Sequence, residues 1–357
     1  MRRLLESTIT TAESLGDGSQ NWNGMRVVAI DKVSLKLPDY PQLCKKFGYH
    51  KGNHNLGSIG VEMAVLFATG LRIPVAYKIG KVYTSDETLF SGLTDKVMKN
   101  DLVLIDNGFY SVDIFSEITD AGASFVCPAN KCATPVMVKK IADGDYISTI
   151  RRAAKDGKPE KVITVRVIFA HRDGFKRRRI VTSLLDPIKY PKEQIVEVYH
   201  ERWHIETFYR DFKVTMAGNS WHCQTPENFE RELCAKLMVA CLIRIAGWRA
   251  ASKRGVKPGV ISFSKALTRT RIFFRTISGS RDPVDFSDAY QELVDGCAKG
   301  LVNSKPGRSF SRDRQEYRKK SRGLVKKRRG RPRKHVYVPE IKPETDTRMK
   351  GTVVLIG

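Results

Sequence analysis

The chain has 357 residues, of which 63 are Lys or Arg and 38 are Asp or Glu, so its formal net charge is +25. That length allows one large or two medium domains, and the excess of positive charge favours a polyanionic partner. The seven cysteines form no C-x-x-C pair, and the first residues contain no apolar run long enough for a secretory signal, which predicts a reduced, cytoplasmic protein. The apolar stretch from 233 to 246 contains Lys236 and Arg244, so we expect a packed helix there and no membrane span.

The first predicted elements are strands. Residues 25 to 31 form a β-branched run that ends in Asp31, and residues 33 to 37 and 59 to 69 are predicted to follow as sequential strands of a meander. A helix around 86 to 99 comes next.

A second apolar run, from 102 to 106, ends in Asp106 and precedes a predicted helix at 111 to 121 and a strand at 123 to 127. An apolar run of this length is typical of a strand buried on both faces. Acids at the carboxyl ends of central strands lie where open α/β sheets place their sites, although such an Asp can also cap the following helix.

Residues 130 to 188 differ in character and are predicted to form a β-rich insertion. Within it, the runs 162 to 169 and 178 to 185 are typical of a β-hairpin. Arg177 and Arg178 at the start of its second strand are candidates for DNA contact, or for protection of an edge strand.

The next helix, residues 199 to 213, is predicted to carry a polar stripe. At about 100° per residue of an α-helix, four polar side chains fall within about 60° of one another: Tyr199, Arg202, Glu206 and Lys213. An apolar stripe beside them would seat the helix on a core. On the helix alone, the polar stripe is equally typical of a solvated face with charge pairs.

The same segment matches the zinc-protease pattern H-E-x-x-H through His200, Glu201 and His204. Both histidines fall roughly opposite the apolar stripe, where a helix faces solvent, and the third ligand would be a distant acid such as Glu230. A zinc hydrolase is therefore the less favoured hypothesis.

The acids of the two strands support a metal-binding role for Glu206. Asp31, Asp106 and Glu206 together offer hard oxygen ligands for a pair of Mg²⁺ ions, which stabilise the attacking and leaving oxygens of an in-line phosphoryl displacement. That chemistry requires an anionic polymer as substrate.

Positive charge is concentrated in one tail. Between Lys305 and Lys334, fifteen Lys or Arg accompany only Asp313 and Glu316, which predicts a segment that is disordered until it meets nucleic acid. Arg329 and Arg331 flank a glycine in an Arg-Gly-Arg-Pro sequence like the core of an AT-hook. Such a segment can enter a narrow minor groove, or simply attract phosphates.

These motifs, in this order, resemble the DDE transposases of bacterial insertion sequences, specifically the insertion-sequence-four family. The resemblance covers roughly residues 20 to 250. It rests on Trp22-Asn-Gly24, Asp106-Asn-Gly108-Phe109, Ser183-Leu-Leu-Asp186, Tyr190-Pro191, the Y-x2-R-x3-E-x6-K spacing from Tyr199 to Lys213, and Gln224-Thr-Pro-Glu227. Lys32-Val33 stands where the family usually has Gly-Thr, which predicts a narrower space beside the metals.

The resemblance implies an α/β fold with a ribonuclease H-like mixed sheet flanked by helices, a β-rich insertion before the catalytic helix, and a helical, basic C-terminal region. The implied segments are an N-terminal remnant at 1–24, the first part of the core at 25–129, the insertion at 130–188, the catalytic helix and the following helix at 189–250, a helical region at 251–304 and the basic tail at 305–357.

The resemblance also implies a catalytic and metal-binding triad of Asp31, Asp106 and Glu206 that holds two Mg²⁺ ions, with Mn²⁺ as a substitute. Three further side chains would hold DNA phosphates: Tyr199, Arg202 and Lys213. The implied reaction is nicking at the ends of the element, followed by strand transfer into target DNA by a homodimer in a synaptic complex in the bacterial cytoplasm, at the nucleoid. A repurposed transposase that binds DNA without catalysis is the alternative.

Overall fold

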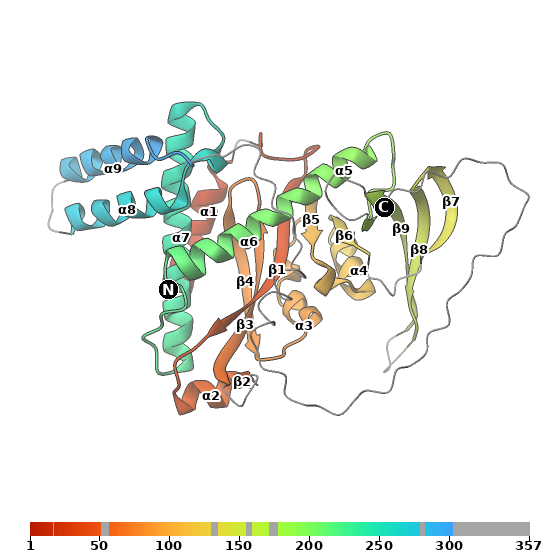
Figure 1. The fold of residues 1–357 in the computed structure, drawn as a ribbon, viewed down its shortest axis with the longest axis horizontal. Coiled ribbons are helices and arrows are strands. Elements are labelled where there is room, and N and C mark those ends of the chain that lie inside the picture. The colour runs from red at the N-terminus through yellow and green to blue at the C-terminus, as the bar shows by residue number, and fades with distance from the viewer. Residues whose placement is uncertain are drawn as a thin grey trace, which may run out of the picture. The chain divides into compact units, whose positions relative to one another are not determined.

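The computed structural model of the protein describes residues 1–16, 18–50, 57–129, 135–154, 159–170, 178–278 and 283–302. In these residues the chain forms one ten-stranded sheet with helices on both faces (Figure 1). The strands are β1 (Arg26–Lys36), β2 (Tyr49–His50), β3 (Ser58–Ala68), β4 (Ile73–Lys81), β5 (Asp101–Ile105), β6 (Ser124–Pro128), β7 (Val136–Ala142), β8 (Asp145–Arg152), β9 (Lys161–Ala170) and β10 (Arg178–Thr182). The α-helices are α1 (Arg2–Glu13), α2 (Pro41–Phe47), α3 (Asp86–Ser91), α4 (Val112–Asp120), α5 (Lys192–Tyr199), α6 (Trp203–Arg210), α7 (Pro226–Arg254), α8 (Phe263–Ile277) and α9 (Pro283–Ala298).

The sheet is mixed. β1 runs antiparallel to β3 and parallel to β5, β3 runs antiparallel to β4, and β5 runs parallel to β6. The central strands thus lie in the order β4-β3-β1-β5-β6. β10 joins β6 to the antiparallel strands β9, β8 and β7, so the β-rich segment extends the same sheet. The predicted α/β class with a mixed sheet between helices is confirmed.

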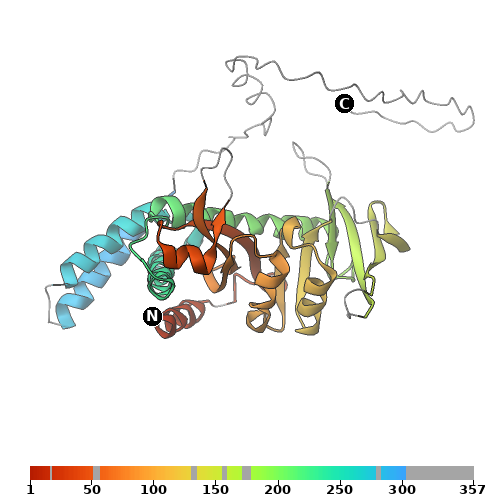
Figure 2. The same ribbon diagram turned by 90° about the horizontal axis from the view of Figure 1, so that it is seen from below.

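The core fills both faces of the sheet because successive side chains of a central strand point to opposite sides. On β1, Val27 and Ala29 face the cluster that α1, α5, α6 and α7 share, whereas Val28 and Ile30 face the cluster that α3 and α4 share. Figure 2 shows α5 and α6 on one side of the sheet and α3 and α4 on the other.

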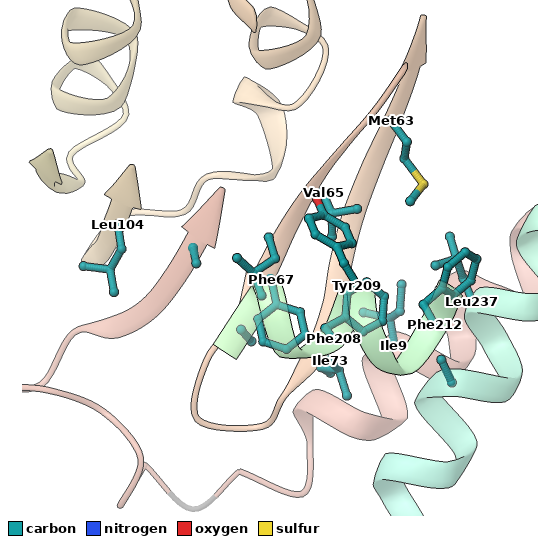
Figure 3. Close-up of a cluster of buried hydrophobic side chains, with 14 of the residues drawn as sticks. Ile9, Met63, Val65, Phe67, Ile73, Leu104, Phe208, Tyr209, Phe212 and Leu237 are labelled. Atoms are coloured by element: carbon teal, nitrogen blue, oxygen red, sulfur yellow. The ribbon is translucent and has the colours of Figure 1, made fainter. Parts of the chain in front are cut away.

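Helix α6 is held on the sheet by aromatic side chains (Figure 3). Phe208 and Phe212 are buried against Val65 and Phe67 of β3, and the ring centroids of Phe67 and Phe208 lie 5.2 Å apart. Burial of a Phe side chain contributes about 1.5–3 kcal/mol. The position of α6 over the central strands therefore depends on hydrophobic packing.

The predicted meander is wrong in its first pairing and in its boundaries, and only the pairing of residues 33 to 37 with 59 to 69 is confirmed. Residues 25 to 31 and 33 to 37 form one strand, β1, because the polar residues after Asp31 continue the alternation between the faces of the sheet. The third strand of the meander is β4, which the sequence analysis did not predict. The predicted helix from 86 to 99 ends at Ser91, since Gly92 follows it, and only a short 3₁₀ turn at Thr94–Lys96 continues.

The predicted helix from 199 to 213 is not one regular α-helix. A 3₁₀ turn at His200–Arg202 separates α5 from α6, and a π-helical turn at Asp211–Thr215 follows α6. A π-helical turn inside a helix is often found at functional sites. The assumption of 100° per residue therefore fails at both ends of α6.

A buried ion pair joins the insertion to the segment before α5. Arg166 on β9 donates to both carboxylate oxygens of Asp145 on β8, at 2.7 and 2.5 Å, and to the carbonyl oxygen of Tyr190 at 2.7 Å. The two side chains are 1% and 3% exposed. Arg166 thus fixes strands β8 and β9 relative to the segment that precedes α5.

The long helix α7 begins at the N-cap Thr225, whose hydroxyl accepts from the Asn228 N–H, and ends before Gly255 in the left-handed conformation at φ +66°. Its second half packs with α8 and α9 around a separate core. No helix in the described ranges combines the length and apolar character that a membrane span needs. The cysteines of these ranges are all free thiols.

Candidate active site

Two acids lie side by side on neighbouring parallel strands, Asp106 just after the end of β5 and Asp31 within β1, which continues to Lys36, so the prediction that Asp31 ends its strand is wrong. Ile30 of β1 is in register with Ile105 of β5, and Asp31 and Asp106 follow these residues directly. The Asp106 side chain does not cap a helix, because the Ser111 hydroxyl accepts the capping hydrogen bond of α4. Asp106 is 41% exposed, so its carboxylate is available to a ligand.

Arg202 bridges the third acid, Glu206, to Asp106 at the end of β5. Arg202 Nη2 lies 2.7 Å from Glu206 Oε1 and 3.6 Å from Asp106 Oδ1. The guanidinium thus lies between the helix acid and the strand acid. The structure thus places Arg202 in contact with Asp106 and Glu206, and Asp31 near enough for the charges of all three to act on its pKa.

Asp31 has an unusual protonation equilibrium. Burial raises the pKa of its carboxyl to about 6, and the negative charges of Asp106 and Glu206 act in the same direction. The Lys32 N–H, which donates to Asp31 Oδ1 at 2.8 Å, and the Arg202 guanidinium only partly oppose this. The cluster therefore has more negative charge than its one arginine can balance.

This raised pKa predicts a pH-dependent stability of the metal-free protein. The Asp31 carboxyl has a pKa of about 6 in the folded chain against 3.8 when unperturbed, so the folded state holds a proton that the unfolded state has released between these values. Stability should fall as pH rises through this window, by about 3 kcal/mol in total. Asp31→Asn should remove this dependence and raise the free energy of unfolding at pH 7, as urea titrations at pH 4, 5, 6 and 7 would measure.

The matched control is Asp39→Asn, which changes an exposed acid outside the cluster. It should leave the pH profile of the wild type unchanged. A variant Asp31→Asn with the same pH profile as the wild type would contradict the predicted burial of charge.

Three side chains of the catalytic segment bind main-chain carbonyl oxygens of the strands that bear the other acids. The Tyr199 hydroxyl donates to Ile105 O at 3.2 Å, the Tyr209 hydroxyl to Asp31 O at 2.7 Å and the Lys213 ammonium to Ser34 O at 3.2 Å. Tyr199 and Lys213, which the resemblance assigns to DNA phosphates, thus also hold the helix on the sheet in this structure.

Tyr209 is a site residue that the sequence analysis missed. It was assigned to the apolar stripe, and its ring does belong to the core. Burial raises the pKa of its phenol well above the ordinary range, so the hydroxyl stays a neutral donor to Asp31 O. The sequence did contain a signal for this contact. A tyrosine in an apolar stripe buries its hydroxyl, and a buried hydroxyl needs a hydrogen-bond partner.

Lys32 does not crowd the acids. Its side chain points to the opposite face of β1 from Asp31, where its ammonium pairs with Asp86 at the start of α3. The predicted narrowing of space beside the metals is therefore wrong.

The histidine pair does not form the alternative zinc site. His204, predicted to face solvent, is half-buried with Nε2 3.1 Å from Arg72 Nη2, and burial together with Arg72 lowers its pKa to about 4. Glu201 accepts from the Thr69 hydroxyl at 2.7 Å, and Glu230 faces Arg2 at 3.7 Å. Among the residues that the structure describes, no three His, Cys, Asp or Glu side chains stand together as ready-made metal ligands.

The other predicted DNA contacts are only partly described. Arg178 is exposed at the start of β10, which pairs with both β6 and β9, so its proposed role in protecting an edge strand is wrong. Its contact with DNA stays a prediction. Arg177, Arg329 and Arg331 lie outside the described residues.

Comparison with known proteins gives three findings. A family model described as a transposase DDE domain matches residues 22–242. Transposase InsG for insertion sequence element IS4 of Escherichia coli K12 is 27% identical over 271 residues, which cover 73% of this chain and 61% of that protein. The chain thus spans about three fifths of that relative. Among solved structures, the piggyBac transposase synaptic complex with hairpin DNA is similar with a TM-score of 0.44 and 14% identity, over 83% of this chain and 61% of that chain.

Proposed function

This chain belongs to the family of transposase DDE domains, and we propose from its site that it is a DNA transposase. The reaction is metal-dependent nicking at the ends of an insertion sequence and transfer of the freed strand into target DNA. The observation that carries this proposal is the convergence of Asp31, Asp106 and Glu206 around Arg202, with the two aspartates on neighbouring parallel strands.

The chemistry of the three acids suits divalent metal ions, because all three offer the carboxylate oxygens that Mg²⁺ and Mn²⁺ prefer. A bound ion would have to draw the three side chains together, since they do not stand as a ready-made ligand group in the metal-free chain. It would also favour the charged form of Asp31, whose pKa is raised mainly by burial and further by Asp106 and Glu206. We assign the binding of two Mg²⁺ ions to Asp31, Asp106 and Glu206. When bound, such ions supply charge neutralisation to the attacking and leaving oxygens of a phosphodiester.

The remaining residues of the site orient and attract the substrate. Arg202 can form two parallel hydrogen bonds to a phosphate, which would draw the guanidinium away from Asp106 and Glu206 and free their oxygens. Lys213 adds a point charge to the site. Its pKa is lowered mainly by burial and further by the positive charge of the nearby Lys36. In the first step, water attacks the phosphorus atom at the element end and displaces the 3′ oxygen of that end, which leaves as a 3′ hydroxyl. In the second step, this 3′ hydroxyl attacks a phosphodiester of the target DNA and displaces the 3′ oxygen of the target strand.

Metal dependence tests this proposal. Purified protein should nick a plasmid that bears the DNA flanking its gene when Mg²⁺ or Mn²⁺ is present, and EDTA should abolish nicking while binding of the plasmid persists. The assay is gel separation of nicked from supercoiled plasmid, with a plasmid without the flanking DNA as the control. Equal nicking in EDTA would contradict a metal mechanism.

The proposal includes double-stranded DNA as partner, at both the element ends and the target, and a homodimer that pairs two ends. Light scattering of the protein with short duplexes of the flanking DNA should give two chains per complex of two duplexes. One chain per complex at all ratios would reject the paired state without affecting the assignment of the triad.

A further inference from the structure

A basic groove lies away from the triad, along the edge strand β4. Its cavity has a volume of about 410 Å³ and takes its walls from α1, α2, β4 and α7. Four of the lining residues are basic, and only one is acidic: Arg2, Lys46, Lys78 and Lys81 against Glu230. The single acid faces Arg2 at 3.7 Å. The Lys78 side chain lies against Gly92 at the end of α3, on the opposite face of the sheet, so the groove itself has a net excess of two positive charges.

The lysines of the groove are not used by the fold. Within the described ranges, Lys46, Lys78 and Lys81 take part in no ion pair. All three side chains are exposed. A groove of one charge sign raises the local concentration of ligands of the opposite sign.

Two of these lysines are brought together by the backbone. The Val82 N–H donates to the Phe47 carbonyl at 2.8 Å, which joins the end of β4 to the end of α2. Lys81 and Lys46 directly precede these two residues, so they lie at the same end of the groove. Lysines on an edge strand can simply prevent edge-to-edge pairing. That role accounts for Lys78 and Lys81, and Arg2 pairs with Glu230, but neither explains Lys46 on α2.

We propose that this groove binds the phosphates of a DNA strand outside the triad, an inference that rests on the proposed function. The groove lies on β4, two strands away from β1 with its Asp31, and buried aromatic side chains of α6 pack on β3 between the two places. The phosphates that it binds therefore lie away from the reacting bond. Phosphate contacts in the groove would increase the affinity for DNA and fix the position of the protein along it, but they would not recognise the base sequence.

The test compares two double variants of the full chain with equal loss of charge. K46Q/K81Q removes the unpaired lysines of the groove, and K45Q/K257Q removes two exposed lysines that do not line it. Fluorescence anisotropy with a labelled random duplex, at several salt concentrations and without divalent metal, gives the slope of log affinity against log salt. For K46Q/K81Q the slope should fall by about 2 and the affinity at moderate salt on the order of 10-fold. The control should match the wild type.

Each outcome decides the proposal. Equal slopes for both double variants would overturn it, as would a K46Q/K81Q chain that binds the duplex normally but has lost the binding of a polyglutamate peptide, because the groove would then serve a protein partner. Failure of the proposed function would give a different result. The wild type would still show a steeper dependence of log affinity on log salt than K46Q/K81Q, but it would not nick DNA with Mg²⁺.

Discussion

Replacement of Asp31, Asp106 or Glu206 by Ala should each reduce strand nicking on the order of 10³-fold or more, because each change removes oxygen ligands worth several kcal/mol of transition-state stabilisation. DNA binding should persist, since the positive charges of the chain remain. The measurements are nicking of a plasmid that bears the flanking DNA and anisotropy with a labelled duplex, both with Mg²⁺.

The matched control is Asp95→Ala, which removes an acid that is 69% exposed and pairs only with its neighbour Lys96. That variant should nick at the wild-type rate. If any one of the three alanine variants retains metal-dependent nicking at the wild-type rate, the residue that it lacks does not belong to the triad.

Replacement of Arg166 by Met should destabilise the protein by about 3–5 kcal/mol. The change leaves the Asp145 carboxylate buried without a cation and the Tyr190 carbonyl without its donor. Urea unfolding followed by circular dichroism would measure the loss. It should be accompanied by weaker nicking, because the insertion and the approach to α5 lose their link.

An exposed arginine of the same sheet provides the comparison. Arg151 is 72% exposed and lies 3.8 Å from Glu160, so Arg151→Met should cost less than about 1 kcal/mol. The double variant Arg166→Met with Asp145→Leu should recover most of the lost stability, since it buries no unpaired charge. Equal losses for the Arg166 and Arg151 single variants would contradict a structural role for the buried pair.

The fold class was predictable because its signals are local. The apolar runs that end in Asp31 and Asp106 have the length of buried strands, and both are strands. The order of motifs predicted the family, and the match of residues 22–242 to the transposase DDE domain, together with the similarity to transposase InsG, confirms it. Strand β4 escaped prediction because polar and apolar residues do not alternate strictly along it.

The site was predictable in part. Spacing on an ideal helix correctly grouped Arg202 with Glu206, since only four positions separate them. It failed for His204, because the turn between β3 and β4 places Arg72 over a face that helical periodicity assigns to solvent. The hydrogen bonds of Tyr199, Tyr209 and Lys213 to carbonyl oxygens were out of reach, since they depend on which strand lies beneath the helix.

The hydrogen bond between Tyr209 and the Asp31 carbonyl joins positions 178 apart in the chain, with most of the sheet and the whole insertion between them. Contacts between such distant positions form late in folding, and during synthesis the N-terminal part emerges first. A nascent polypeptide still on the ribosome therefore holds two of the three acids long before the third arrives. On this ordering, a prematurely terminated product lacks one of the three acids to which we assign nicking.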